Sequence, residues 1–169
     1  MTTKTVALSK ASLFSLDVIL PALAFSIPFL VAGPQLLTGT VVNTLLFLSA
    51  SRASKKTAIT TALLPSIGAL LNGLVFGKFT PFLLYFLPFI WISNLILISI
   101  FQNNSRPVFG ILSASIVKSL FLFIIAFVFF RLSVVPQIFL TAMGIFQLTT
   151  AVLGGFVYLL INKLVPLDK

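Results

Sequence analysis

Few side chains in this sequence could do chemistry. The chain contains no Cys, no His and no Glu, and its only acids are Asp17 and Asp168. The usual protein ligands of zinc, iron–sulfur clusters and haem are therefore missing. Cys nucleophiles, His general bases and paired carboxylates are missing as well. We expect no metal site, no cofactor and no catalytic residue, and an enzyme is the weakest of the functional alternatives.

One lysine is unusual because of its position. Lys118 lies about ten residues inside an apolar run, which corresponds to about 15 Å along a helix, and Ser115 and Ser119 share its helical face. If that run spans a membrane, the buried charge costs several kcal/mol and indicates a functional site by default. Three interpretations stay open: the side chain extends to the lipid headgroups, it bonds to Asp17 or to helix carbonyls, or it contacts an anionic or carbonyl group of a bound substrate.

Other polar residues lie at a similar depth in neighbouring apolar runs. Trp91 and Asn94 are near the middle of one run and Gln147 is near the middle of another, while Asn43 and Asn72 lie nearer the outside in the second and third runs. The amides either hydrogen-bond between helices or line a binding site, and a Trp away from interfacial depth suits stacking on a flat ring. The predicted substrate-binding residues are Lys118, Asn94, Trp91, Gln147, Asn72 and Asn43.

The composition places these residues in a membrane. The chain has 169 residues, of which 59% are hydrophobic and only 8% charged, with a mean hydropathy of +1.21. A soluble domain carries about 25% charged residues, so thirteen charged side chains cannot cover a water-facing surface. The roughly 100 apolar residues supply five or six membrane spans of about 20 residues each. We predict an integral membrane protein.

Short polar breaks divide the chain into six apolar stretches, and Gly or Pro occurs at nearly every break, as turns require. The predicted fold class is an all-α membrane protein, a six-span helical bundle that forms a single transmembrane domain over residues 1–169. The predicted spans cover residues 13–32, 36–50, 57–76, 82–101, 108–130 and 137–161.

The basic residues predict the orientation of this bundle. With six spans, eight of them fall on the side that holds both termini, and only Lys78 and Arg131 fall on the other. The positive-inside rule then places both termini in the cytoplasm of a multi-pass protein of the cell (inner) membrane. The net charge of +9 matches anionic inner-leaflet lipid, and we expect no nucleic-acid partner. The eight residues are Lys4, Lys10, Arg52, Lys55, Lys56, Arg106, Lys163 and Lys169.

Small residues at four-residue spacing predict close helix contacts. In the third span this stripe runs from Ala58 to a GxxxG pair, Gly73 and Gly77, and in the sixth it includes Ala151 and Gly154. We expect both stripes to pack inside the bundle. The first span is different, because an end helix has an open side and an external partner helix is nearly as good an explanation. Its candidate partner-interface residues are Ala7, Ala11, Ser15, Ala22 and Ser26.

A six-span bundle of about 170 residues with both termini inside resembles the substrate-binding S component of energy-coupling factor (ECF) vitamin transporters. The segment Ala32-Gly-Pro-Gln-Leu-Leu-Thr-Gly-Thr-Val-Val-Asn43 is similar to the Gly/Pro-containing first outer loop and short second span of that family. The small-residue stripes of the first span resemble the surface by which the family binds its transmembrane coupling subunit.

The resemblance implies a subunit that captures a small vitamin-like or micronutrient molecule from outside. A separate coupling subunit and ATPases would energise uptake, and the chain itself has no phosphate-binding P-loop motif. One Lys with Asn, Gln and Trp suits a small, largely apolar molecule that carries a carboxylate or a few polar edges. The alternative is a non-transporting membrane scaffold or assembly factor, in which the stripes hold partners and the polar residues only join helices.

Overall fold

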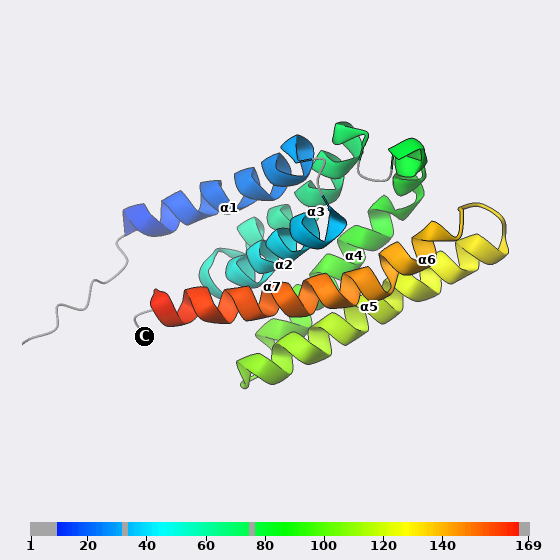
Figure 1. Ribbon diagram of the computed structural model, residues 1–169. Helices are drawn as coiled ribbons and strands as arrows, with labels where there is room; N and C mark the ends of the chain where they lie inside the picture. Colours follow the sequence, from blue (N-terminus) through cyan, green and yellow to red (C-terminus); the bar gives the residue numbers. More distant parts are fainter. Residues whose placement is uncertain (1–9, 32–33, 75–76, 166–169) are drawn as a thin grey trace, which may run out of the picture.

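The computed structural model describes residues 10–31, 34–74 and 77–165, with side chains from Leu16 onward, and these residues form helices and short connections without any strand (Figure 1). This confirms the all-helical prediction. The elements are α1 (Lys10–Leu30), α2 (Gln35–Arg52), α3 (Lys55–Asn72), the 3-10 helix η1 (Gly77–Phe82), α4 (Leu83–Gln102), α5 (Pro107–Arg131), α6 (Ile138–Met143) and α7 (Ile145–Leu164).

Three helical segments in the described part of the chain are long and apolar enough to cross a membrane. They are Gly77–Gln102, Pro107–Arg131 and Ile138–Leu164, and they coincide with the last three predicted spans. The apolar part of α1, Leu16–Leu30, is shorter. Helices α2 and α3 have 18 residues each and are less apolar. The structure therefore supports a membrane protein with at least three apolar helices of spanning length.

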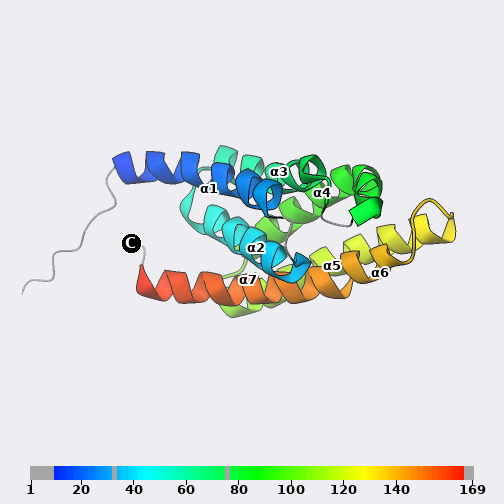
Figure 2. The ribbon, with the colours of Figure 1, turned by 45° about the horizontal axis from the view of Figure 1, so that its top comes forward.

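Helix α2 lies inside the bundle, which explains why it can be less apolar than a helix surrounded by lipid. It contacts α1, α3, α4 and α7, and the residues from Asn43 to Phe47 are all buried. Around it, α1 packs along α3, α4 packs along α5, and α7 packs against both α2 and α5 (Figures 1 and 2). A helix enclosed in this way can keep polar side chains, because its neighbours rather than lipid must satisfy them.

The two ends of the bundle differ in charge. The start of α1, the α2–α3 and α4–α5 connections and the end of α7 lie at one end, which we call the basic end (Figure 1). The opposite end holds the end of α1, the start of α2, η1 and the α5–α6 loop. Lys78 and Arg131 belong to that opposite end, whereas the basic end has the residues Lys10, Arg52, Lys55, Lys56, Arg106 and Lys163.

Two helices end or break where the sequence predicted a continuous span. Helix α3 ends at Asn72, and Gly73 caps it with a left-handed φ of 75°, so the expected GxxxG pair of Gly73 and Gly77 is not a helix-packing motif. Both glycines have open space around them and positive φ angles, which glycine adopts most readily. The predicted sixth span is divided at Gly144 into α6 and α7. A side chain at Gly144 would lie 2.7 Å from the Leu140 carbonyl oxygen, which explains why glycine occupies this break.

Close helix contacts elsewhere follow the predicted stripes. Ala58, Ala62 and Ser66 of α3 are buried, and so are Ala151 and Gly154 of α7. The internal-packing interpretation of both stripes is therefore confirmed for these residues. Between α1 and α3, a side chain at Gly68 would collide with the Phe25 carbonyl. Glycine at this position thus lets the two helix backbones approach each other closely.

Candidate functional site

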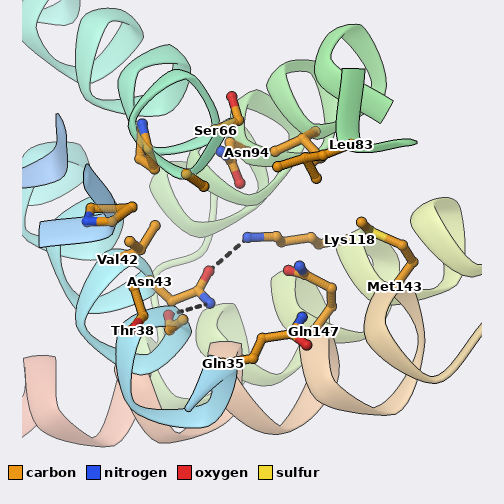
Figure 3. A pocket seen from close by; sticks show the side chains of 15 residues that line it. Gln35, Thr38, Val42, Asn43, Ser66, Leu83, Asn94, Lys118, Met143 and Gln147 are labelled. Atoms are coloured by element: carbon orange, nitrogen blue, oxygen red, sulfur yellow. Dashed lines mark hydrogen bonds between the residues drawn. The ribbon is translucent and has the colours of Figure 1, made fainter. Parts of the chain in front are cut away.

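A cavity of about 110 Å³ lies between the helices, in the half of the bundle away from the basic end. Each of the helices α1 to α7 contributes at least one lining residue, so the cavity is a property of the whole bundle. Apolar side chains such as Val42, Ile90 and Met143 form much of the wall. The polar side chains that line the cavity are Gln35, Thr38, Asn43, Ser66, Asn94, Lys118 and Gln147 (Figure 3).

Lys118 of α5 extends into this cavity. Only 2% of the residue is exposed, and its Nζ donates a 2.7 Å hydrogen bond to Oδ1 of Asn43 on α2. Its side chain therefore does not extend to the lipid headgroups. Asp17 is not its partner either, because Oδ1 of Asp17 accepts hydrogen bonds from the Ser54 backbone N–H at 3.1 Å and the Thr57 hydroxyl at 2.6 Å. Contact with a ligand stays open among the three interpretations, and the structure adds Asn43 as a neutral partner.

Asn43 is held in place by its own amide nitrogen. Nδ2 donates to the Gly39 carbonyl at 2.9 Å and to the Thr150 hydroxyl of α7 at 3.2 Å. Gly154 permits this arrangement, since a side chain there would lie 2.8 Å from Asn43 Cβ. The Asn43 oxygen is thereby directed at Lys118, and a chain of hydrogen bonds links α5, α2 and α7 beside the cavity.

Asn94 and Gln147 line the cavity from two further helices. Nδ2 of Asn94 donates to the Ala62 carbonyl of α3 at 2.7 Å, so this residue both joins two helices and contributes to the wall. The side-chain amide of Gln147 has no hydrogen-bond partner among the described residues. The hydroxyl of Thr38 is also buried without a partner in that part of the chain. Two polar groups beside the cavity are thus available to an occupant.

Trp91 and Asn72 do not line the cavity, contrary to their predicted grouping with the other four. The Trp91 indole N–H donates to the Ser66 hydroxyl at 2.8 Å and to the Leu63 carbonyl at 3.1 Å, which joins α4 to α3. Asn72 donates to the Phe29 carbonyl at 2.8 Å and joins the end of α3 to α1. Membrane depth indicated that these side chains need partners, and neighbouring helices supply them.

Two residues of the site were missed by sequence reasoning because they adjoin a predicted loop. Gln35 begins α2, and its amide donates to the Ala142 carbonyl of α6 at 3.2 Å. Thr38 follows one helical turn later. The spacing of Gln35, Thr38, Gly39 and Asn43 places them on one face of a helix. This polar face is the sequence pattern that could have indicated that the first turn of α2 belongs to the site.

The predicted partner surface of α1 is only partly described. Ala7 lies outside the described residues, and the side chains of Ala11 and Ser15 do as well. Ala22 is exposed on the surface of α1, and Ser26 is half-buried. Val18 and Ile19 are exposed next to Ala22, so this face of α1 is apolar and is not covered by another described helix.

No protein-family model, curated protein or solved structure matches the chain.

Proposed function

We propose that this chain is a membrane-embedded substrate-capture subunit for uptake of a small vitamin-like or micronutrient molecule, similar to the S component of an ECF transporter. The observation that carries the proposal is the cavity, which each of the helices α1 to α7 lines and into which Lys118 and Gln147 project. Polar groups inside a membrane bundle are costly and are associated with ligand or ion sites. Polar side chains that only join helices would be hydrogen-bonded to them, whereas the Gln147 amide and the Thr38 hydroxyl have no partner among the described residues.

The proposed topology has six crossings with both termini in the cytoplasm. The crossings are α1, α2, α3, η1 with α4, α5, and α6 with α7. Their directions alternate between the basic end and the opposite end (Figure 2). The 18 residues of α2 and of α3 correspond to about 27 Å of helix, close to the roughly 30 Å of a hydrocarbon core. The concentration of basic residues at one end supports placing that end in the cytoplasm.

This orientation puts the cavity in the outer half of the membrane, where a ligand can enter from outside. Release to the cytoplasm then requires a change of conformation that this chain cannot energise, because its sequence has no P-loop. We assign that step to a separate transmembrane coupling subunit with ATPases. The exposed apolar face of α1 around Ala22 is the proposed contact surface. No catalytic residue is assigned, because the chain has no His, Cys or Glu.

A non-transporting membrane scaffold or assembly factor is the second candidate. It is favoured by the hydrogen bonds of Trp91, Asn72 and Asn94, since each of these side chains joins two helices. In that case the polar residues stabilise the bundle, and the surface of α1 holds an unrelated membrane protein. The cavity would have no specific occupant.

Gentle purification from the native host, followed by mass spectrometry of proteins and small molecules, separates the two candidates. Capture predicts one metabolite at near-stoichiometric amounts and a copurifying membrane protein with ATPases. An empty protein in an unrelated membrane complex would overturn the proposal in favour of the scaffold. Gln147→Leu should lose the metabolite, whereas the matched control Gln137→Leu alters a residue that does not line the cavity and should keep it.

A further inference from the structure

The charge and size of the cavity narrow the chemistry of its occupant. We infer that the captured molecule is a compact monocarboxylate whose carboxylate binds the Lys118 ammonium and whose apolar body fills the rest of the cavity. This inference depends on the proposed capture function of the same site.

No described acid lines the cavity beside Lys118. Its ammonium has three N–H donors, and Asn43 Oδ1 is its single hydrogen-bond acceptor among the described residues. Asp17 bonds to the start of α3 instead. A buried lysine with only a neutral partner lacks the opposite charge that would offset the loss of hydration of its ammonium form. An anion in the cavity would supply that charge and accept the remaining N–H donors.

Neutral hydrogen-bonding groups line the same cavity as Lys118. The Gln147 amide and the Thr38 hydroxyl can each donate a hydrogen bond, and both line the cavity without a partner in the described part of the chain. Either group could donate a hydrogen bond to the second oxygen of a carboxylate whose first oxygen binds Lys118. A ligand cation would meet the like charge of Lys118, since no described acid lines the cavity to attract it.

The cavity is also small. A cavity of roughly 150 Å³ accommodates benzene, so a cavity of about 110 Å³ suits a molecule of at most about six non-hydrogen atoms. Val42, Ile90 and Met143 offer apolar contact for its body. A phosphate ester would carry more negative charge than one lysine offsets. A single carboxylate on a short apolar body agrees with the charge, the donors and the volume together.

Binding of butyrate and butyramide to the full chain in lipid nanodiscs at pH 7 tests the inference. The two probes have the same number of non-hydrogen atoms and nearly the same shape, and only butyrate is charged. Saturation-transfer NMR titrations should give at least tenfold tighter binding of butyrate. This preference should disappear in Lys118→Gln and persist in Lys78→Gln, which alters an exposed lysine outside the cavity.

Equal affinity for the two probes would overturn the assignment of a carboxylate, and so would the absence of butyrate binding. Persistence of the preference in Lys118→Gln would overturn the role of Lys118. If Lys118→Gln does not fold, Gln147→Leu takes its place and should weaken butyrate binding several-fold. The capture function is tested separately by the metabolite and partners retained on purification. An uncharged copurified metabolite would support capture and overturn only the assignment of a carboxylate ligand.

Discussion

Lys118 of α5 and Asn43 of α2 are 75 residues apart in sequence and are joined beside the cavity by a 2.7 Å hydrogen bond. Asn43 in turn donates to Thr150 of α7, so three helices meet through one amide side chain. The bond leaves a buried ammonium with a neutral acceptor. A ligand that offers a better acceptor to Lys118 would compete with Asn43 and would alter contacts among α2, α5 and α7. Occupancy of the proposed site would therefore be coupled to helix packing.

Removing the Asn43 acceptor should destabilise the protein. Asn43→Leu leaves the Lys118 ammonium without its hydrogen bond, and bonds to charged groups contribute about 1.5–3 kcal/mol. We expect the free energy of unfolding in detergent to fall by about that amount. The double variant Asn43→Leu with Lys118→Met should lose less than the sum of the single variants, because the two residues interact directly.

Asn104 provides the control for this experiment. Its amide donates at 2.8 Å to the Ile100 carbonyl within the same chain segment at the end of α4, and no buried charge depends on it. Asn104→Leu should therefore change the free energy of unfolding much less than Asn43→Leu. Equal losses, or strict additivity in the double variant, would show that the Lys118–Asn43 bond contributes little.

Trp91 should matter for stability and not for ligand binding. Trp91→Phe keeps an aromatic ring but removes the N–H that bonds to Ser66 and Leu63 of α3. We expect a loss of about 1 kcal/mol in the free energy of unfolding and an unchanged dissociation constant for the copurified ligand. Gln147→Leu should behave in the opposite way, since its amide joins no described helices and lines the cavity. Weaker ligand binding in Trp91→Phe would show that Trp91 contributes to the binding site.

The contrast between Trp91 and Lys118 separates what the sequence can predict from what it cannot. Polar groups in the middle of apolar runs are conspicuous, so Lys118, Asn94 and Gln147 are recognisable from the sequence alone. Depth along a helix does not reveal which helix faces a side chain. The same pattern therefore describes Trp91, whose N–H is satisfied by α3, and Gln147, whose amide is not satisfied by any described residue.

The fold was predictable to a similar extent. Apolar runs and their Gly/Pro breaks predicted the helices, because both patterns depend on local sequence. The break at Gly144 depends on contacts distant in sequence, since a side chain there would also lie 2.9 Å from the Phe123 ring. The end of α3 at Asn72 likewise involves the Phe29 carbonyl of α1. Such contacts become visible only when the helices are assembled.

The exposed face of α1 should be required for partner binding and not for ligand binding. Ala22→Trp adds a large side chain to this surface, where α1 has no described neighbour. We expect loss of the proposed coupling subunit on copurification and unchanged ligand content. Leu160→Trp is the control, because Leu160 is also apolar and is exposed on α7. Retention of the partner by Ala22→Trp, or its loss from both variants, would reject α1 as the contact surface.

The six-span topology can be tested with single cysteines, because the chain has none of its own. Pro34→Cys and Lys78→Cys should react with a membrane-impermeant maleimide added to intact cells, whereas Lys55→Cys and Arg106→Cys should react only after lysis. Residues 34 and 55 decide the result, since they flank α2. If only the three long apolar segments crossed the membrane, α2 would not cross and both cysteines would react from the same side. Opposite reactivity at these two positions requires α2 to span the bilayer, as the proposed six-span topology requires.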